Sequence, residues 1–134
     1  MVNREDLEKF IDRLSAEGAT YQELEPGLWT INPGGELDIG VVVHFSPPVV
    51  VMRVKVMDSP GDAATSARLN RRLLELNATD LLHGSYGIDN GSIVLTEALE
   101  LGHLDFTEFQ AAYESITLAL PTHLRELATI REAK

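Results

Sequence analysis

The chain has 134 residues, no cysteine, and a net charge of −10 at pH 7 from 21 acidic and 11 basic residues. This length fits one domain, 1–134, whose core is large enough to need no covalent staple. The absence of cysteine excludes disulfides, thiolate metal sites and thiol catalysis. The acidic balance argues against nucleic acid as a partner, because lysine and arginine supply most of the affinity for phosphate backbones.

The basic residues and the apolar runs further restrict the expected partners and the expected cellular location. The one basic cluster, Arg68, Arg71 and Arg72, is interpreted as a solvated helix face or as partners for nearby carboxylates. The segment MVNREDLEKF is charged where a signal peptide is apolar, so we expect a cytoplasmic protein. No apolar run approaches the ~20 residues of a membrane-spanning helix, so we expect no membrane partner.

The first predicted element is an amphipathic helix that Asn3 caps and Gly18 ends. Its apolar residues recur at helical spacing and form one stripe: Leu7, Phe10, Ile11 and Leu14. Two short strand-like runs, 21–25 and 28–31, follow on either side of a Pro-Gly turn. Trp29, in the second run, is expected to fill the core.

The clearest strand pattern lies between residues 37 and 56. Alternate residues of the first strand are expected to face the core: Leu37, Ile39, Val41, Val43 and Phe45. The next strand is expected to point four residues inward: Val50, Met52, Val54 and Val56. A four-residue turn, 46–49, predicts a register that pairs Phe45 with Val50 and Val42 with Arg53. A slip of one residue would move every side chain to the other face.

A second helix and a hairpin are predicted after this pair of strands. The polar segment 58–62 leads into a helix at about 64–77. The Asn-Gly sequence at 90–91 is the strongest hairpin signal in the chain, because these residues tolerate the positive φ of a type I′ turn. The strand 93–100 then returns antiparallel.

The last predicted element is a long helix with Asp105 as its candidate cap. Pro121 lies inside it, where a missing N–H and a steric clash predict a kink or a break. The order is thus helix, three strands, helix, two strands, helix. This order predicts an α+β fold with one antiparallel sheet.

No group of residues forms a catalytic or metal-binding pattern. None of the four histidines, His44, His83, His103 and His123, has the i+3 or i+4 partner of a helical metal site, and each is expected to be a surface or strand residue. The glycine pairs lack the lysine and helix of a phosphate cradle, and no serine lies in a GxSxG motif. The sequence therefore predicts no catalytic residue, no metal site and no cofactor.

Two features favour binding. Val42, Val49 and Val51 fall on the outer face of the central strands, so this face is a candidate partner-binding surface. The alternative is that the last helix covers it. The leucines of the helix 64–77 are expected to serve either the core or a symmetric partner.

The segment from Leu73 to Ile116 carries a family resemblance. The stretch LLELNATDLLHGSYGIDNGSIVLTEALEL, with the following DFTEFQAAYESI, is similar to YbjN-like proteins. The element order resembles the type III secretion chaperone-like fold across nearly the whole chain. The similarity rests on apolar spacing and a few turn residues: Leu73, Leu74, Asn77, Ala78, Gly84, Gly87, Ile88, Asp89, Val94 and Leu95.

This resemblance implies a small acidic homodimer without catalytic activity. Members that act in secretion bind an extended, unfolded segment of an effector along apolar patches, and YbjN-like members are described as regulators. Dimers in this fold are commonly built around the second helix, which would put Leu69, Leu73 and Leu76 near the interface. The three arginines of that helix would then need acidic partners across the twofold axis.

The leading hypothesis is therefore a non-enzymatic protein-binding module, chaperone-like or regulatory, that acts as a homodimer. The rival hypothesis is a small-molecule-binding or weakly catalytic α+β domain with a cleft between the sheet and the third helix. A purely structural subunit is a third alternative. A deep enclosed pocket with converging polar groups would favour the rival, whereas an open apolar face or groove would favour the first.

Overall fold

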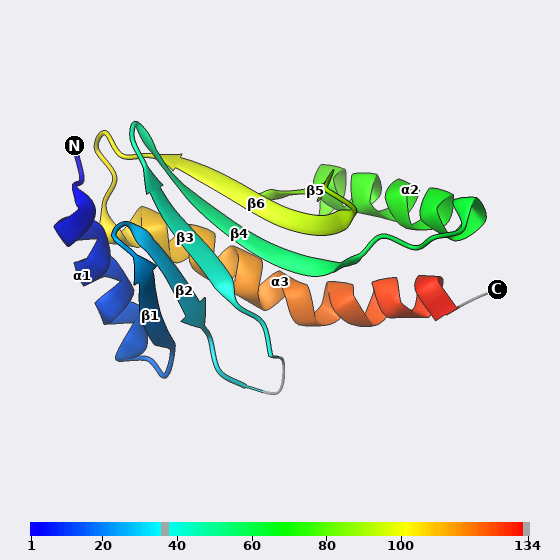
Figure 1. Ribbon diagram of the computed structural model, residues 1–134, viewed down its shortest axis with the longest axis horizontal. Coiled ribbons are helices and arrows are strands. Elements are labelled where there is room, and N and C mark those ends of the chain that lie inside the picture. The colour runs from blue at the N-terminus through cyan, green and yellow to red at the C-terminus, as the bar shows by residue number, and fades with distance from the viewer. Residues whose placement is uncertain (36–37, 133–134) are drawn as a thin grey trace.

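A six-stranded antiparallel sheet and three helices form the part of the chain that the computed structural model describes, residues 1–35 and 38–132 (Figure 1). This is the α+β fold with a single antiparallel sheet that the sequence predicts. The elements in chain order are α1 (Arg4–Ser15), β1 (Thr20–Glu25), β2 (Leu28–Asn32), β3 (Val41–Ser46), β4 (Val49–Asp58), α2 (Ala63–Thr79), β5 (Ser85–Asp89), β6 (Ser92–Glu100) and α3 (Phe106–Glu132).

The strands lie in the order β1-β2-β3-β4-β6-β5, so β1 and β5 are the two edges. The predicted register of the central hairpin is confirmed: Phe45 pairs with Val50 and Val42 with Arg53. This register points Val43 and Met52 to the same face, where both are fully buried. The alternation of apolar residues and the short turn together set it, because a slip of one residue would expose these side chains.

Four strands precede α2, one more than the expected three. The two short runs on either side of the Pro-Gly turn each form a strand and pair with each other as β1 and β2. Gly27 has a φ of 82°, which permits this tight turn. The tight turn joins the two short runs directly, so they form two antiparallel strands in place of one.

Strand β3 begins later than the sequence predicts. Its pairing with β2 ends at Ile31 and Val41, one residue before the end of β2, and residues 38–40 pair with no strand. Without a partner their backbone groups cannot continue the ladder. Leu37, expected in this strand, lies outside the described residues.

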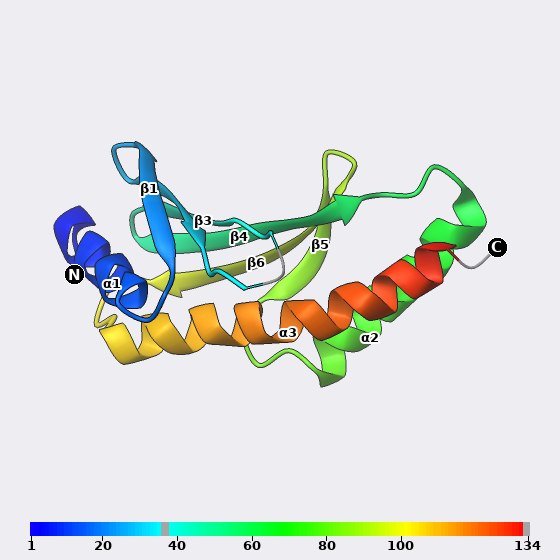
Figure 2. The same cartoon turned by 90° about the horizontal axis from the view of Figure 1, so that it is seen from below.

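All three helices cover the same face of the sheet (Figure 2). The core lies between this helical layer and the inward-facing strand residues, and its fully buried members include Leu7, Ile11, Trp29, Ile31, Val41, Val43, Val50, Met52, Leu69, Ile93, Leu95, Phe109, Ile116 and Leu120. The expected place of Trp29 in the core is thus confirmed. The opposite face of the sheet carries no helix (Figure 2).

Polar side chains define where two helices start. At α1, the backbone N–H of Asp6 donates to Asn3 Oδ1 at 2.8 Å, and the Asn3 N–H donates to Asp6 Oδ2 at 3.1 Å. This reciprocal pair satisfies two N–H groups that the helix itself leaves open. Asp105 accepts from the Glu108 N–H at 2.7 Å, as its expected role as a cap requires.

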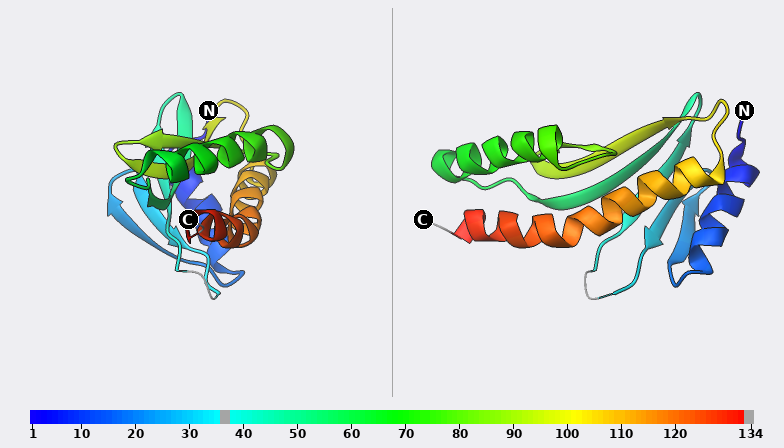
Figure 3. Two further views of the ribbon diagram at one scale, coloured as in Figure 1. Left: turned by 90° about the vertical axis from the view of Figure 1, so that its right-hand side faces the viewer. Right: turned by 180° about the vertical axis from the view of Figure 1, so that it is seen from behind.

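Of the expected kink or break at Pro121, the break does not occur, because α3 continues through this residue as a single helix. Leu120 and His123, on either side of the proline, are 0% and 2% exposed. Their packing holds the helix together although Pro121 cannot donate a backbone hydrogen bond. The helix does change direction along its length, as the view from behind in Figure 3 shows.

Candidate partner-binding surfaces

The open face of the sheet carries the three valines that were predicted to bind a partner. Val42 lies on β3, and Val49 and Val51 lie on β4, each with a half-buried side chain. The alternative that α3 covers this face is wrong, because α3 lies with the other helices on the opposite side (Figure 2). The structure thus leaves the valines accessible to a partner, and their role in binding stays a prediction.

Charged residues border this valine stripe on β4. Arg53 forms an ion pair with Asp89 of β5, and Lys55 pairs with Asp58 at 2.9 Å. Both cations are therefore already neutralised within the chain. The open face is apolar along Val42 and Val51, these two ion pairs lie beside them, and the exposed Glu100 lies opposite Val49.

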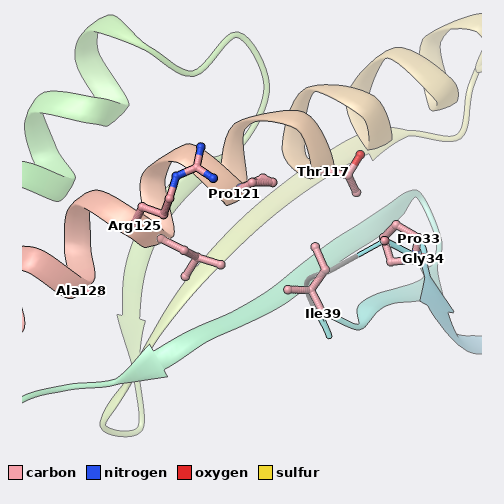
Figure 4. Close-up of a pocket in the computed structure, with 9 residues that line it drawn as sticks. Pro33, Gly34, Ile39, Thr117, Pro121, Arg125 and Ala128 are labelled. Atoms are coloured by element: carbon pink, nitrogen blue, oxygen red, sulfur yellow. The ribbon is translucent and has the colours of Figure 1, made fainter.

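A groove of about 690 Å³ lies between α3 and the segment that leads into β3 (Figure 4). Pro121, Leu124 and Ala128 form its wall on α3, and Pro33 and Ile39 form the facing wall. Gly34 and Gly35 also line it, with φ values of 84° and 89°. We call this hollow the α3 groove; its lining is mainly apolar.

Two polar groups stand out in the α3 groove. Thr117 lines it one turn before Pro121, and because Pro121 has no N–H it cannot donate to the Thr117 carbonyl as a helical residue would. Arg125 lines the groove with an exposed side chain (Figure 4). No carboxylate of residues 1–35 or 38–132 lies within ion-pair distance of its guanidinium.

The lining of the α3 groove includes Ile39, which also borders a second hollow. This second hollow is polar, has a volume of about 390 Å³, and is lined by Thr30, Gly40 and residues of β1. Thr30 pairs with Val42 across β2 and β3, and both point to the open face.

The leucines predicted for a dimer interface lie in the core. Leu69, Leu73 and Leu76 of α2 are 0%, 4% and 1% exposed. Their neighbour Leu74 is 68% exposed, and Ile88 of the edge strand β5 is 56% exposed. These two residues flank a shallow hollow of about 260 Å³ between α2 and β5. We call this hollow and its two apolar residues the α2–β5 face.

The arginines of α2 have acidic partners within the chain. Arg72 forms a two-pronged contact with Glu126 of α3, at 2.6 Å from Nε and 3.3 Å from its terminal nitrogen. Arg71 lies 3.9 Å from Glu75 one turn further along the helix. Arg68 also has an interaction partner. Arg71 and Arg72 therefore already have carboxylate partners within the chain, and a dimer would not have to supply them across a twofold axis.

A buried chain of hydrogen bonds joins α2, α3 and β5, and the sequence did not reveal it. His123 is 2% exposed, which makes the expectation of a surface or strand histidine wrong for this residue. Its Nε2 lies 2.6 Å from Asp80 Oδ2 and its Nδ1 lies 2.6 Å from the Tyr86 hydroxyl. The backbone of Tyr86 is held in turn by Asn77, which accepts from its N–H at 2.7 Å.

This chain has the order of an acid, a base and a hydroxyl, as in a nucleophilic triad. With Nε2–H donating to Asp80, the neutral ring can accept the Tyr86 proton at Nδ1. However, burial raises the pKa of Tyr86 well above its usual 10.0, with the charges of Asp80 and Glu126 adding to the effect. The hydroxyl therefore keeps its proton at neutral pH, and its contact with His123 and that of His123 with Asp80 join three elements.

The other histidines and acidic residues give no metal site. His44 is exposed on the open face, His83 lies 3.6 Å from Glu97, and His103 adopts a positive φ of 65° in a turn. Within residues 1–35 and 38–132, no group of three or more histidine, aspartate or glutamate side chains is placed to hold a metal ion. No helix in the same residues has the length and apolarity needed to cross a membrane.

Solved structures with the same fold come from complexes of type III secretion proteins and from YbjN. A chain of the heterodimeric ExoU–SpcU complex of the Pseudomonas aeruginosa type III secretion system matches with a TM-score of 0.64 and 16% identity, over 89% of this chain and 94% of that one. E. coli YbjN matches with a TM-score of 0.63 and 13% identity, over 93% and 94%. A chain of the HopA1–SchA chaperone–effector complex matches with 0.55 and 12%, over 99% and 100%.

Sequence comparison places the chain in a family. No curated protein matches it. The family model described as CesT_Tir_1, which represents chaperones of type III secretion, matches residues 2–133, nearly the whole chain. The resemblance inferred from the sequence is thereby confirmed. The chain belongs to the CesT_Tir_1 family and has the type III secretion chaperone fold.

Proposed function

We propose that this protein is a non-enzymatic, chaperone-like or regulatory module that holds a segment of another polypeptide. Its family and its similarity to chains in the ExoU–SpcU and HopA1–SchA complexes support a protein-binding role. The net charge of −10 argues against nucleic acid as that partner. The observation that carries the proposal is the sheet face with Val42, Val49 and Val51, which no helix covers (Figure 2).

The hollows of the described residues support this proposal over a small-molecule site. A small ligand is usually bound in a concave pocket where several polar groups converge. The α3 groove is open along its length and mainly apolar, with a single charged side chain, Arg125, in its lining. An open apolar groove suits a polypeptide, because side chains of an extended segment can enter it while the backbone stays solvated.

We further propose that two copies associate through the α2–β5 face. Leu74 and Ile88 are exposed there, and β5 is an edge strand of the sheet. Leu69, Leu73 and Leu76 would support this interface from the core by holding α2 in place. A symmetric contact would cover both the leucine and the strand edge.

The partner-binding role is tested by substituting the open face. In Val51→Asp a charge lies in the middle of the valine stripe, and the double variant Val42→Thr, Val51→Thr introduces two hydroxyls without a change of volume. We expect both variants to lose the polypeptide that co-purifies with the tagged wild type from native lysate, because the apolar contact is replaced by polar groups. Circular dichroism verifies that each variant is folded.

Leu118→Asp is the matched control, because Leu118 is 75% exposed on α3 and lies outside the open face. This variant should retain the partner. Once identified, the partner is purified and titrated against each variant by calorimetry. The proposal is contradicted if the folded Val51 variants bind the purified partner as tightly as the Leu118 control, or if no polypeptide binds the wild type.

A further inference from the structure

We propose that the α3 groove selects the bound polypeptide: it takes an extended apolar segment that carries one side-chain carboxylate, which pairs with Arg125. This inference rests on the proposed protein-binding function and names the chemistry of the partner. It is carried by the apolar walls of the groove and by an arginine, Arg125, that has no carboxylate partner among residues 1–35 and 38–132.

The walls of the groove favour apolar side chains. Pro121, Leu124 and Ala128 face Ile39 across it, and the glycines at 34 and 35 add no side chain that would narrow it (Figure 4). Its volume of about 690 Å³ has room for several side chains of a bound segment. Burying apolar area there is the main source of affinity for any occupant.

Arg125 supplies the selective contact. The chain has 21 acidic residues, and Arg4, Arg53 and Arg72 all pair with carboxylates. Among residues 1–35 and 38–132, the Arg125 guanidinium has no such partner, although it lies at an apolar groove. A guanidinium beside apolar surface binds a carboxylate through two parallel hydrogen bonds, which makes it suitable for recognising aspartate or glutamate in a partner.

The net charge of the protein helps to distinguish recognition by Arg125 from a non-specific electrostatic attraction between the protein and the peptide. A net charge of −10 repels acidic peptides at long range. A preference for an acidic peptide therefore requires a local cation at the binding site. The four exposed or partly exposed groove residues Pro121, Leu124, Arg125 and Ala128 offer that combination of apolar surface and cation.

The test uses three fluorescein-labelled synthetic peptides of 12 residues with amidated C-termini. They contain four leucines on one side of an extended chain and differ only at one central position, which is aspartate, asparagine or lysine. Fluorescence anisotropy measures their affinities for the full chain. We expect the aspartate peptide to bind about two- to five-fold more tightly than the asparagine peptide, the range that one exposed ion pair supplies.

Arg125→Gln should abolish this preference, and Arg125→Glu should shift it to the lysine peptide. Arg71→Gln is the matched control, because it removes the same charge from an exposed arginine of α2 that lies outside the groove. It should keep the preference for aspartate. Ala128→Gln partly fills the groove, so this variant should bind all three peptides more weakly.

The inference is overturned if the aspartate and asparagine peptides bind equally, if none of the three peptides binds, or if Arg71→Gln and Arg125→Gln reduce the preference to the same extent. Any of these results can occur while Val51→Asp still abolishes capture of the natural partner. In that case the proposed function holds and only the selective role of the groove fails. Loss of both would reject the two proposals together.

Discussion

The hydroxyl of Tyr113 is buried in α3 without a hydrogen-bond partner among the described residues. A buried polar group left unpaired costs free energy that a ring without the hydroxyl would avoid. We therefore expect Tyr113→Phe to raise the free energy of unfolding by about 1 kcal/mol. Urea denaturation of both proteins at neutral pH measures the difference, and a loss of stability in the variant would contradict it.

The same substitution changes the pH dependence of stability. Burial, with the nearby charges of Glu114 and Glu17, raises the pKa of Tyr113 from 10.0 to about 12. Above pH 10 the unfolded chain loses this proton and the folded chain keeps it, so the folded state becomes less stable as pH rises towards about 12. Tyr113→Phe should lose less stability than the wild type over this range, as urea denaturation at a series of alkaline pH values will show.

Single residues show what the sequence could and could not reveal. The core position of Trp29 followed from its place in an apolar strand. The buried state of His123 did not, because a histidine in a helix has no local feature that reports contacts with Asp80 and Tyr86, 43 and 37 residues away. Such contacts depend on the packing of three elements, which residue spacing alone does not give.

Three elements are joined at His123: the end of α2 through Asp80, β5 through Tyr86, and α3 through the histidine itself. His123→Ala leaves the buried Tyr86 hydroxyl without an acceptor and opens a cavity beside it. We expect a loss of about 2–3 kcal/mol in the free energy of unfolding. Amide hydrogen exchange should also become faster in β5 and the last turn of α2, because the link that holds them is gone.

Asp80→Asn is the control for this substitution. Its amide oxygen can still accept from His123, and the side chain at this position is largely exposed, so the stability should change little. If His123→Ala and Asp80→Asn have the same free energy of unfolding, the hydrogen-bond chain contributes nothing to the packing of α2 on α3.

At the level of elements, the sequence predicted the features that depend on residues close together in the chain. The register of β3 and β4 followed from the alternation of apolar residues together with the short turn 46–49. The continuity of α3 through Pro121 did not, because the buried residues on both sides of the proline compensate for its missing hydrogen bond. The late start of β3 depends on where its pairing with β2 ends, and the sequence of β3 contains no signal of that.

For the whole molecule, association through the α2–β5 face predicts a particle of twice the 14.7 kDa of one chain. Leu74→Asp introduces a charge at the centre of that face on a side chain that is 68% exposed, so the fold should tolerate it. We expect dimerisation at least about tenfold weaker, the effect of truncating a central interface residue. Size-exclusion chromatography with light scattering measures it across a dilution series.

Leu24→Asp tests whether the effect is specific. Leu24 is 52% exposed and lies on β1, the opposite edge of the sheet, so this variant should associate as the wild type does. A wild-type mass of one chain at all concentrations would reject the dimer. It would leave the partner-binding role of the open face untouched.

The fold could be predicted from the sequence as a whole, whereas the candidate site could be predicted only in part. The outward direction of Val42, Val49 and Val51 followed from strand alternation. The α3 groove is lined by both Ile39 and Arg125, which are far apart in the sequence, and residue spacing does not report such a contact surface. Leu74 is the exposed leucine of α2, whereas Leu69, Leu73 and Leu76 point towards the core.

The two ends of the described chain lie at opposite ends of the molecule, with α3 spanning most of the length between them (Figure 1). The first residues sit beside α1 and the turn after β6, where the Val2 N–H donates to the Leu101 carbonyl at 3.0 Å. A tether at Met1 therefore anchors the molecule by the end remote from α2 and from the C-terminal half of α3. Immobilised in this way on a sensor chip, the protein would present its grooves to the flowing solution.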